Sequence, residues 1–186
     1  MPKYIFIIIC TFFNLKSIAQ FGAQRIITTE ADGSRIICAA DVDGDGNIDI
    51  LSANNFGNNL TWYKNLDGLG NFGPQNIIAP LDTIHVSTAD IDGDGDMDVL
   101  AVSHLNDLVV WYENLDGQGS FSSRKIISNS TDGAYVVIAA DIDGDGDMDV
   151  ISGSDNSGIA WYENTDGNGN FGLARIIILP LRLHAL

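Results

Sequence analysis

The stretch Asp41-Val42-Asp43-Gly44-Asp45-Gly46-Asn47-Ile48-Asp49 recurs in two close copies, which begin at Asp90 and Asp141. The first two copies start 49 residues apart and the last two 51 residues apart. Two aromatic series follow nearly the same period, namely Trp62, Trp111 and Trp161, and Phe21, Phe72, Phe121 and Phe171. A period of about fifty residues indicates an array of structural repeats, each too small to bury its own apolar faces.

The period divides most of the chain into units. The repeats are predicted to span residues 21–71, 72–120 and 121–170, with the start of a fourth at Phe171, so that 20–177 form one repeat region. Residues 178–186 match nothing upstream, which favours truncation of a longer array. This apolar tail contains Pro180 and no turn signal. We expect it to be poorly ordered or to cover an exposed sheet edge.

Within each repeat, short apolar runs alternate with clusters of Gly, Asn and Asp, a pattern typical of strands joined by tight turns. In the first repeat the expected strands are 25–28, 36–40, 48–53 and 60–63. Four antiparallel strands per repeat are typical of a propeller blade. We therefore predict an all-β fold, a β-propeller-type array of about three four-stranded antiparallel blades. Closed propellers have about 4–8 blades, so this array is expected to be incomplete, open, or closed by several copies.

The acidic nonapeptide has the chemistry of a metal loop. Carboxylates at positions 1, 3, 5 and 9 converge if the chain curls tightly, and glycines at positions 4 and 6 permit that curl. Position 7 is expected to supply its backbone carbonyl. Oxygen ligands alone favour Ca²⁺ over Zn²⁺ or Mg²⁺. We predict about three calcium sites with the following residues: Asp41, Asp43, Asp45, Asn47 and Asp49; Asp90, Asp92, Asp94, Asp96 and Asp98; Asp141, Asp143, Asp145, Asp147 and Asp149.

Neither an ordinary turn nor an EF-hand fits these loops as well as a calcium site between strands. Asp and Gly are common in ordinary turns, but all three copies keep the four carboxylates at the same spacing. An EF-hand needs a Glu at position 12 and flanking helices. Position 12 here is Ser52, Ala101 or Ser152, and the flanking runs resemble strands.

The repeat resembles the FG-GAP/VCBS family, which includes the propeller blades of integrin α subunits. The resemblance rests on the Asp-x-Asp-Gly-Asp-Gly-x-x-Asp loops, on Trp-Tyr-Glu-Asn at 111–114 and 161–164, and on Asn-Phe-Gly at 71–73 and 170–172. It covers about residues 21–177. It implies a β-propeller with calcium, usually structural, in hairpin loops on one rim. Family members are extracellular adhesion modules, lectins and accessory regions of secreted polysaccharide-active enzymes. Lys64 departs from the pattern, because the other copies have Glu there.

The N-terminus, residues 1–19, is predicted to be a signal peptide. Lys3 precedes an apolar run from Tyr4 to Phe13, and Ser17 and Ala19 are the small residues before a cleavage site at Gln20. We therefore expect a secreted or cell-surface protein. The run is too short to span a membrane comfortably, and no later run is long enough. After cleavage Cys38 remains alone, so no internal disulfide is expected.

Charge and residue types exclude several functions. A net charge of −16 and a pI near 4.1 make nucleic acid a poor partner. No catalytic constellation recurs, and His85, His104 and His184 occupy non-equivalent positions, so no enzyme activity is expected. The Trp-Tyr pairs are explained either by packing between blades or by platforms for sugar rings.

These observations predict a calcium-stabilised adhesion module that binds a glycan or an extracellular protein. Recognition is expected in the variable loops 54–59, 103–107 and 154–158, because variable loops on a fixed frame usually carry binding residues. The alternative is a structural fragment or accessory module of a larger secreted polysaccharide-active enzyme or surface protein. Open blade edges would also allow self-association.

Overall fold

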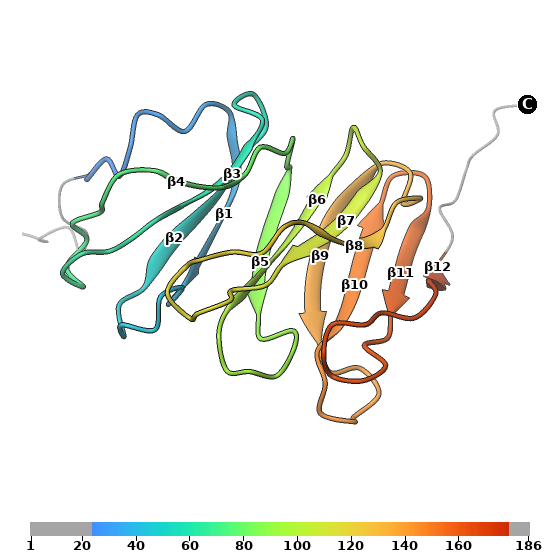
Figure 1. The fold of residues 1–186 in the computed structure, drawn as a ribbon. Coiled ribbons are helices and arrows are strands. Elements are labelled where there is room, and N and C mark those ends of the chain that lie inside the picture. The colour runs from blue at the N-terminus through green and yellow to red at the C-terminus, as the bar shows by residue number, and fades with distance from the viewer. Residues whose placement is uncertain (1–23, 179–186) are drawn as a thin grey trace, which may run out of the picture.

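The computed structural model describes residues 24–178, which form twelve strands and no helix (Figure 1). The predicted signal peptide and most of the predicted tail lie outside this range. The first sheet contains β1 (Ser34–Ala40), β2 (Asp49–Asn54), β3 (Asn59–Tyr63) and β4 (Asn76–Ala79). The second contains β5 (His85–Ala89), β6 (Asp98–Ser103), β7 (Leu108–Tyr112) and β8 (Lys125–Ser128). The third contains β9 (Ala134–Ala140), β10 (Asp149–Ser154), β11 (Gly158–Tyr162) and β12 (Arg175–Ile178).

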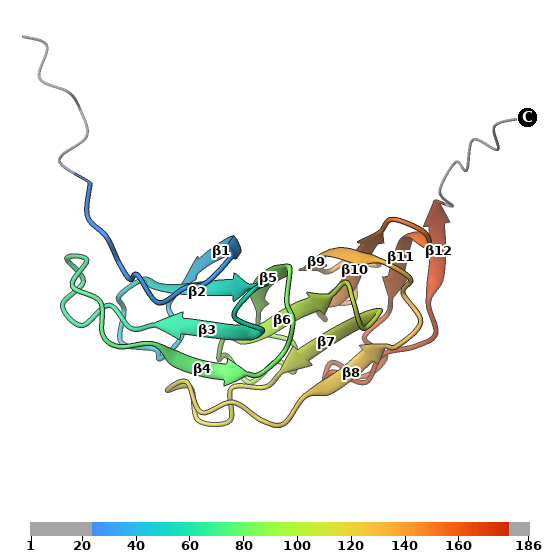
Figure 2. The same ribbon diagram turned by 90° about the horizontal axis from the view of Figure 1, so that it is seen from above.

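The three sheets form an open array. Within each sheet the four strands are antiparallel and follow chain order. The first strand of the middle sheet, β5, lies beside the first strands of both neighbouring sheets, β1 and β9. Figure 2 shows these three strands on the inner side of an arc, with β4, β8 and β12 on the outer side. The predicted all-β, propeller-type array of three four-stranded blades is confirmed, and the array does not close into a ring. None of the described residues forms a helix that could span a membrane.

The sheets are displaced in phase from the sequence repeats. The run 25–28, expected as a strand of the first sheet, forms no strand. Its counterpart in the next unit, Asn76–Ala79, instead becomes the fourth strand of the first sheet, with Asn76 opposite Trp62. Arg175–Ile178, expected to open a fourth repeat, completes the third sheet in the same way. The run at 25–28 has no preceding third strand among the described residues, so it lacks a pairing partner.

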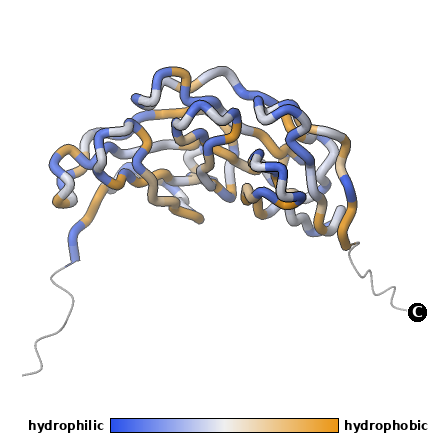
Figure 3. Tube along the Cα trace, turned by 90° about the horizontal axis from the view of Figure 1, so that it is seen from below, coloured by the Kyte–Doolittle hydropathy of each residue, from blue (hydrophilic) through white to orange (hydrophobic). Residues whose placement is uncertain are grey.

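Two apolar layers hold the sheets together. Between the first and second sheets, Leu51, Leu60 and Trp62 pack against residues that include Val99 and Val110. The corresponding layer between the second and third sheets comprises Ile84, Ile91, Leu100, Val102, Val109, Trp111, Ala134, Val137, Val150, Ala160 and Tyr162. Each large apolar side chain stabilises the fold by about 1.5–3 kcal/mol when it is fully buried. Figure 3 shows that the hydrophobic colouring also includes the last described strand, β12.

The tryptophans of the first two sheets pack between blades. Trp62 is 7% exposed and Trp111 is 1% exposed. Each lies under a glycine from a turn of the following sheet, Gly119 over Trp62 and Gly169 over Trp111. A sugar ring therefore has no access to the faces of these two indoles, and packing explains their recurrence.

The glycine above Trp62 offers a sharp test of this packing. A Cβ at Gly119 would lie 2.6 Å from Cζ2 of Trp62, whereas a Cβ at Gly46 would meet nothing within 4 Å. The two glycines have nearly the same φ, +87° and +86°. Because the backbone strain is matched, Gly119→Ala should lower the free energy of unfolding in urea by about 1–3 kcal/mol more than Gly46→Ala. Equal losses would show that the indole moves aside without cost.

Candidate metal sites

The three acidic loops lie at one end of the array, each between the first and second strands of its sheet (Figure 1). Because neighbouring strands are antiparallel, the turns that follow the third strands, 67–70, 116–119 and 166–169, lie at this same end. The hairpins that join the second and third strands, around 54–59, 103–108 and 154–158, lie at the opposite end.

Positions 1, 3 and 5 of each loop converge. In every triad, one carboxylate oxygen from each residue lies within 4.8 Å of the others. The predicted curl is present: Gly44 and Gly46 adopt φ values of +68° and +86°, and their counterparts also have positive φ. The triads are Asp41, Asp43 and Asp45; Asp90, Asp92 and Asp94; and Asp141, Asp143 and Asp145.

Backbone N–H groups of the loop fix two of the three carboxylates. In the first loop Gly46 N donates to Asp41 Oδ2 at 2.9 Å, and Asn47 N donates to Asp45 Oδ1 at 2.9 Å. The second and third loops repeat both hydrogen bonds. These hydrogen bonds hold each loop in its curled conformation, so little rearrangement of the backbone is needed to bind an ion.

Several oxygens of the first two triads are left without a partner. Oδ1 of Asp41, Asp43, Asp90 and Asp92 is buried and accepts no hydrogen bond. A buried acceptor with no donor costs about 1–3 kcal/mol, and more when it is charged. A hard cation would satisfy these oxygens, so the residues present fit Ca²⁺. The third triad is exposed, and Asp141 Oδ1 accepts from Gly144 N at 2.8 Å.

Close carboxylates and burial shift the pKa values of the triads. Burial raises the pKa of Asp92, and the nearby carboxylate of Asp94 adds to the increase. Asp143 is exposed, and partial desolvation by the loop together with the nearby carboxylate of Asp145 raises its pKa. Both effects disfavour the charged form of the acid, and a bound divalent cation would oppose them.

Position 9 has a different environment. Asp49, Asp98 and Asp149 are fully buried, and both oxygens of each accept backbone N–H groups. Asp98 Oδ2 accepts from Ile91 N at 3.0 Å and Oδ1 from Asn114 N at 2.8 Å, and the other two repeats have the same pair of bonds. Burial outweighs these hydrogen bonds and raises the pKa of Asp98 to about 7. Position 9 thus joins the start of each loop to the chain that follows the third strand.

The side chain at position 7 points towards the turn after the third strand. Oδ1 of Asn47, Asp96 and Asp147 lies 2.3, 2.5 and 2.6 Å from the place where a Cβ would stand on Gly68, Gly117 and Gly167. Any side chain at these glycines would have to displace that oxygen, and their positive φ values also favour glycine. With the side chain directed to the turn, the backbone carbonyl remains the ligand that we predict from this position.

An asparagine links each of the first two loops to the repeat that follows it. Asn114 Nδ2 donates to Val42 O of the first loop at 2.8 Å, and Asn164 Nδ2 donates to Ile91 O of the second loop at 2.8 Å. Since Asn114 N also donates to Asp98, one hydrogen-bond chain runs through all three loops. Asn114 and Asn164 were not predicted to have this role from the sequence. The signal that could have found them is their fixed place after each Trp-Tyr pair.

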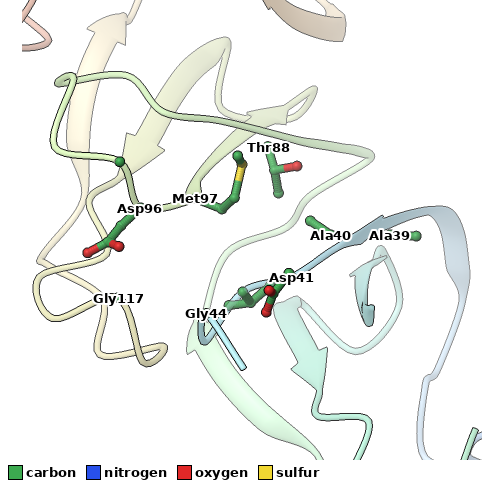
Figure 4. Close-up of a pocket in the computed structure, with 10 residues that line it drawn as sticks. Ala39, Ala40, Asp41, Gly44, Thr88, Asp96, Met97 and Gly117 are labelled. Carbon is green, nitrogen blue, oxygen red and sulfur yellow. The ribbon is translucent and has the colours of Figure 1, made fainter. Parts of the chain in front are cut away.

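A hollow lies between the first two loops (Figure 4). Its lining includes Asp41 from the first loop and Asp96 and Met97 from the second. Figure 4 shows that the two carboxylates come from different loops, with Gly44 beside the first and Gly117 beside the second. Solvent therefore reaches the junction of these repeats at the metal-loop end.

Sequence comparison assigns the chain to a family. A sequence model described as an FG-GAP-like repeat matches residues 41–101 and 90–152, which together form more than half of the chain. The chain belongs to the FG-GAP-like repeat family. A comparison with curated proteins gives no match.

Among solved structures, the chain is similar to the V. cholerae biofilm matrix protein Bap1. The sequence identity is 28% and the TM-score is 0.45. The similarity covers 74% of this chain and 19% of Bap1, so the chain spans a small part of that protein's length.

Proposed function

We propose that this chain is a non-catalytic, calcium-binding repeat module that acts outside the cell in adhesion or in binding a glycan or protein. The observation that carries the proposal is the convergence of three carboxylates in each loop, with buried, unpartnered oxygens in two of the loops. Two carboxylates about 4 Å apart repel by about 1–4 kcal/mol between the dielectric limits of water and a protein surface. A bound Ca²⁺ reverses that repulsion and stabilises the loop.

The role proposed for calcium is structural. Asp98 accepts from Ile91 at the start of its loop and from Asn114, and Asn114 contacts the preceding loop. An ion that fixes one loop therefore also steadies the joint between two sheets. The expected recognition loops lie at the opposite end of the strands, so calcium would support the frame without touching the ligand. The extracellular location rests on the predicted signal peptide, which lies outside the described residues.

A group of exposed side chains at the hairpin end supports the recognition role. His104 and Asp155, from two of the expected recognition loops, lie 3.3 Å apart between Nε2 and Oδ2. The ring of Tyr135 stands edge-on to His104 at 6.4 Å, and the guanidinium of Arg35 lies 5.8 Å from the Tyr135 centroid. These residues come from all three sheets. An exposed aromatic ring beside charged groups suits a sugar or a polar protein surface.

Binding of the protein to an array of immobilised glycans in millimolar calcium tests this function. We expect Tyr135→Ala to weaken binding at least tenfold without a change in the thermal midpoint, because the ring is half exposed. Leu69→Ala is the control, since Leu69 is 78% exposed in a turn at the opposite, metal-loop end of the array. Equal binding by Tyr135→Ala and the parent protein would contradict the proposed surface.

An accessory module of a larger assembly is the second candidate, and one face of the third sheet favours it. Val42 and Ile91 are each 1% exposed, whereas their counterpart Ile142 is 39% exposed. Leu60 and Val109 are likewise fully buried, and the equivalent Ile159 is 37% exposed. The third sheet thus presents the same apolar face that the first two sheets bury against a following repeat, which suits association with a further blade.

A further inference from the structure

The first acidic loop contacts a cation of the protein itself. Lys64 Nζ forms an ion pair with Asp43 and lies 3.1 Å from Asp45 Oδ2. These carboxylates occupy positions 3 and 5 of the first loop and belong to its triad. The Asp43 side chain is only 5% exposed, so the ion pair is partly shielded from water. Lys64 follows directly after β3, at the end of the sheet where the loop lies.

The second and third repeats have the opposite charge at this position. Glu113 and Glu163 replace Lys64, and they pair with Lys125 and Arg175 of the fourth strands. The first repeat has neutral Asn76 where the fourth strands of the others have these cations, as the strand registers show. In the first repeat the positive charge thus lies beside the metal loop, whereas in the second and third repeats it lies on the fourth strand.

The two glutamates increase the negative charge around their loops. Glu113 directly follows β7 and Glu163 directly follows β11, so each carboxylate lies at the same end of its sheet as the acidic loop, in the position that Lys64 has in the first repeat. The first loop differs again at position 7, where neutral Asn47 replaces Asp96 and Asp147. Two separate substitutions thus make the first loop less negative than the other two.

We propose that Lys64 is a tethered counter-ion of the first loop, so that the protein has two calcium sites of higher affinity and one of lower affinity. This inference rests on the proposed calcium function. Calcium entering the first loop must displace the ammonium group from Asp43 and Asp45, which weakens binding there. Lys64 is 36% exposed in its side chain and lies on the surface, so it can swing into solvent when calcium displaces it. Without calcium, the same lysine offsets part of the repulsion among the carboxylates of the first loop, whereas the second and third loops have a glutamate at that position.

Calorimetric titration of the full chain with calcium tests the inference. The parent protein should show two stronger sites and a third that is at least tenfold weaker than either of them. Lys64→Glu should bring the third site to within about threefold of the others, and Lys64→Gln should give an intermediate affinity. Arg35→Glu makes the same change in net charge at an exposed position of β1 near its hairpin end, opposite the acidic loops, so it should leave the three affinities unchanged.

The reciprocal substitution separates the outcomes. Glu113→Lys should convert the second site into a weak one and leave a single strong site. In chelator, Lys64→Glu should lower the thermal midpoint and Glu113→Lys should raise it, because each changes the repulsion in one calcium-free loop. Three equal sites in the parent protein, unaltered in Lys64→Glu, would overturn the role of Lys64 and leave the calcium function standing. No calcium binding by any of these proteins would overturn both.

Discussion

Asp98→Ala is expected to lower the free energy of unfolding by about 2–4 kcal/mol. The substitution leaves the buried N–H groups of Ile91 and Asn114 without acceptors, and each unsatisfied donor costs about 1–3 kcal/mol. Burial disfavours the charged carboxylate and raises the pKa of Asp98 to about 7. Removal of this buried carboxylate therefore offsets part of the loss. Asp98 belongs to the middle repeat, so its loss also releases the link between the first and second sheets. Urea unfolding in excess chelator measures the change.

Two further variants separate the hydrogen bonds from the charge. Asp98→Asn removes the charge and keeps one carbonyl acceptor, so it should lose about half as much stability as Asp98→Ala. Asp94→Ala removes a triad carboxylate whose hydrogen bond to Asp96 N is exposed, and without calcium it should be neutral or stabilising. A gain in stability for both Asp98 variants would show that the buried charge outweighs the two hydrogen bonds.

Calcium is expected to raise the thermal midpoint by about 10–20 °C relative to excess chelator. Extracellular oxygen-ligand sites bind calcium with dissociation constants of about 10⁻⁴–10⁻³ M. At a hundredfold excess over that constant, each site that exists only in the folded state adds about 2.7 kcal/mol. Two filled sites then add about 5 kcal/mol, at roughly 2–4 °C per kcal/mol for a domain of this size. Circular dichroism in about 10 mM calcium, a hundred times the tighter constant, provides the measurement.

The controls for this shift use acids of two kinds. A triple replacement of the position 3 residues by Asn should abolish the response to calcium; these residues are Asp43, Asp92 and Asp143. The same replacement in the turns after the third strands, at Asp67, Asp116 and Asp166, should preserve the response, because Asn keeps the Oδ1 acceptor that these turns use. The same midpoint in calcium and in chelator would contradict a structural role for the metal.

The architecture was predictable from the sequence because the decisive signals are periodic and local. Gly44 and Gly46 permit positive φ, so the curl of the first loop follows from its own residues. The sheet that each strand joins is not determined by local sequence. The run at 25–28 resembles Asn76–Ala79 in composition, yet only the latter follows a third strand with which it can pair. A strand's own residues do not specify whether its partner precedes or follows it.

The candidate sites show the same division. The triads follow from the spacing of Asp within a tight loop, and the structure brings positions 1, 3 and 5 together. In the sequence, position 9 groups with them by charge alone. The two backbone N–H groups that Asp98 accepts come from Ile91 and Asn114, which no spacing rule identifies. Lys64 is only a minor departure in the sequence, and its position beside Asp43 becomes apparent only in the folded loop.

The asparagine links also determine how such an array can change in evolution. Asn114 and Asn164 donate to equivalent carbonyls, those of Val42 and Ile91, so donor and acceptor are interchangeable between repeats. Deletion of the middle repeat would bring Asn164 to the carbonyl of Val42, and duplication of a repeat would add one more identical pair. Each link also has a direction, from a repeat to the one before it, so a repeat joined in the reverse orientation would lose it. Unequal recombination between repeats could therefore lengthen or shorten the array while every joint kept its hydrogen bond.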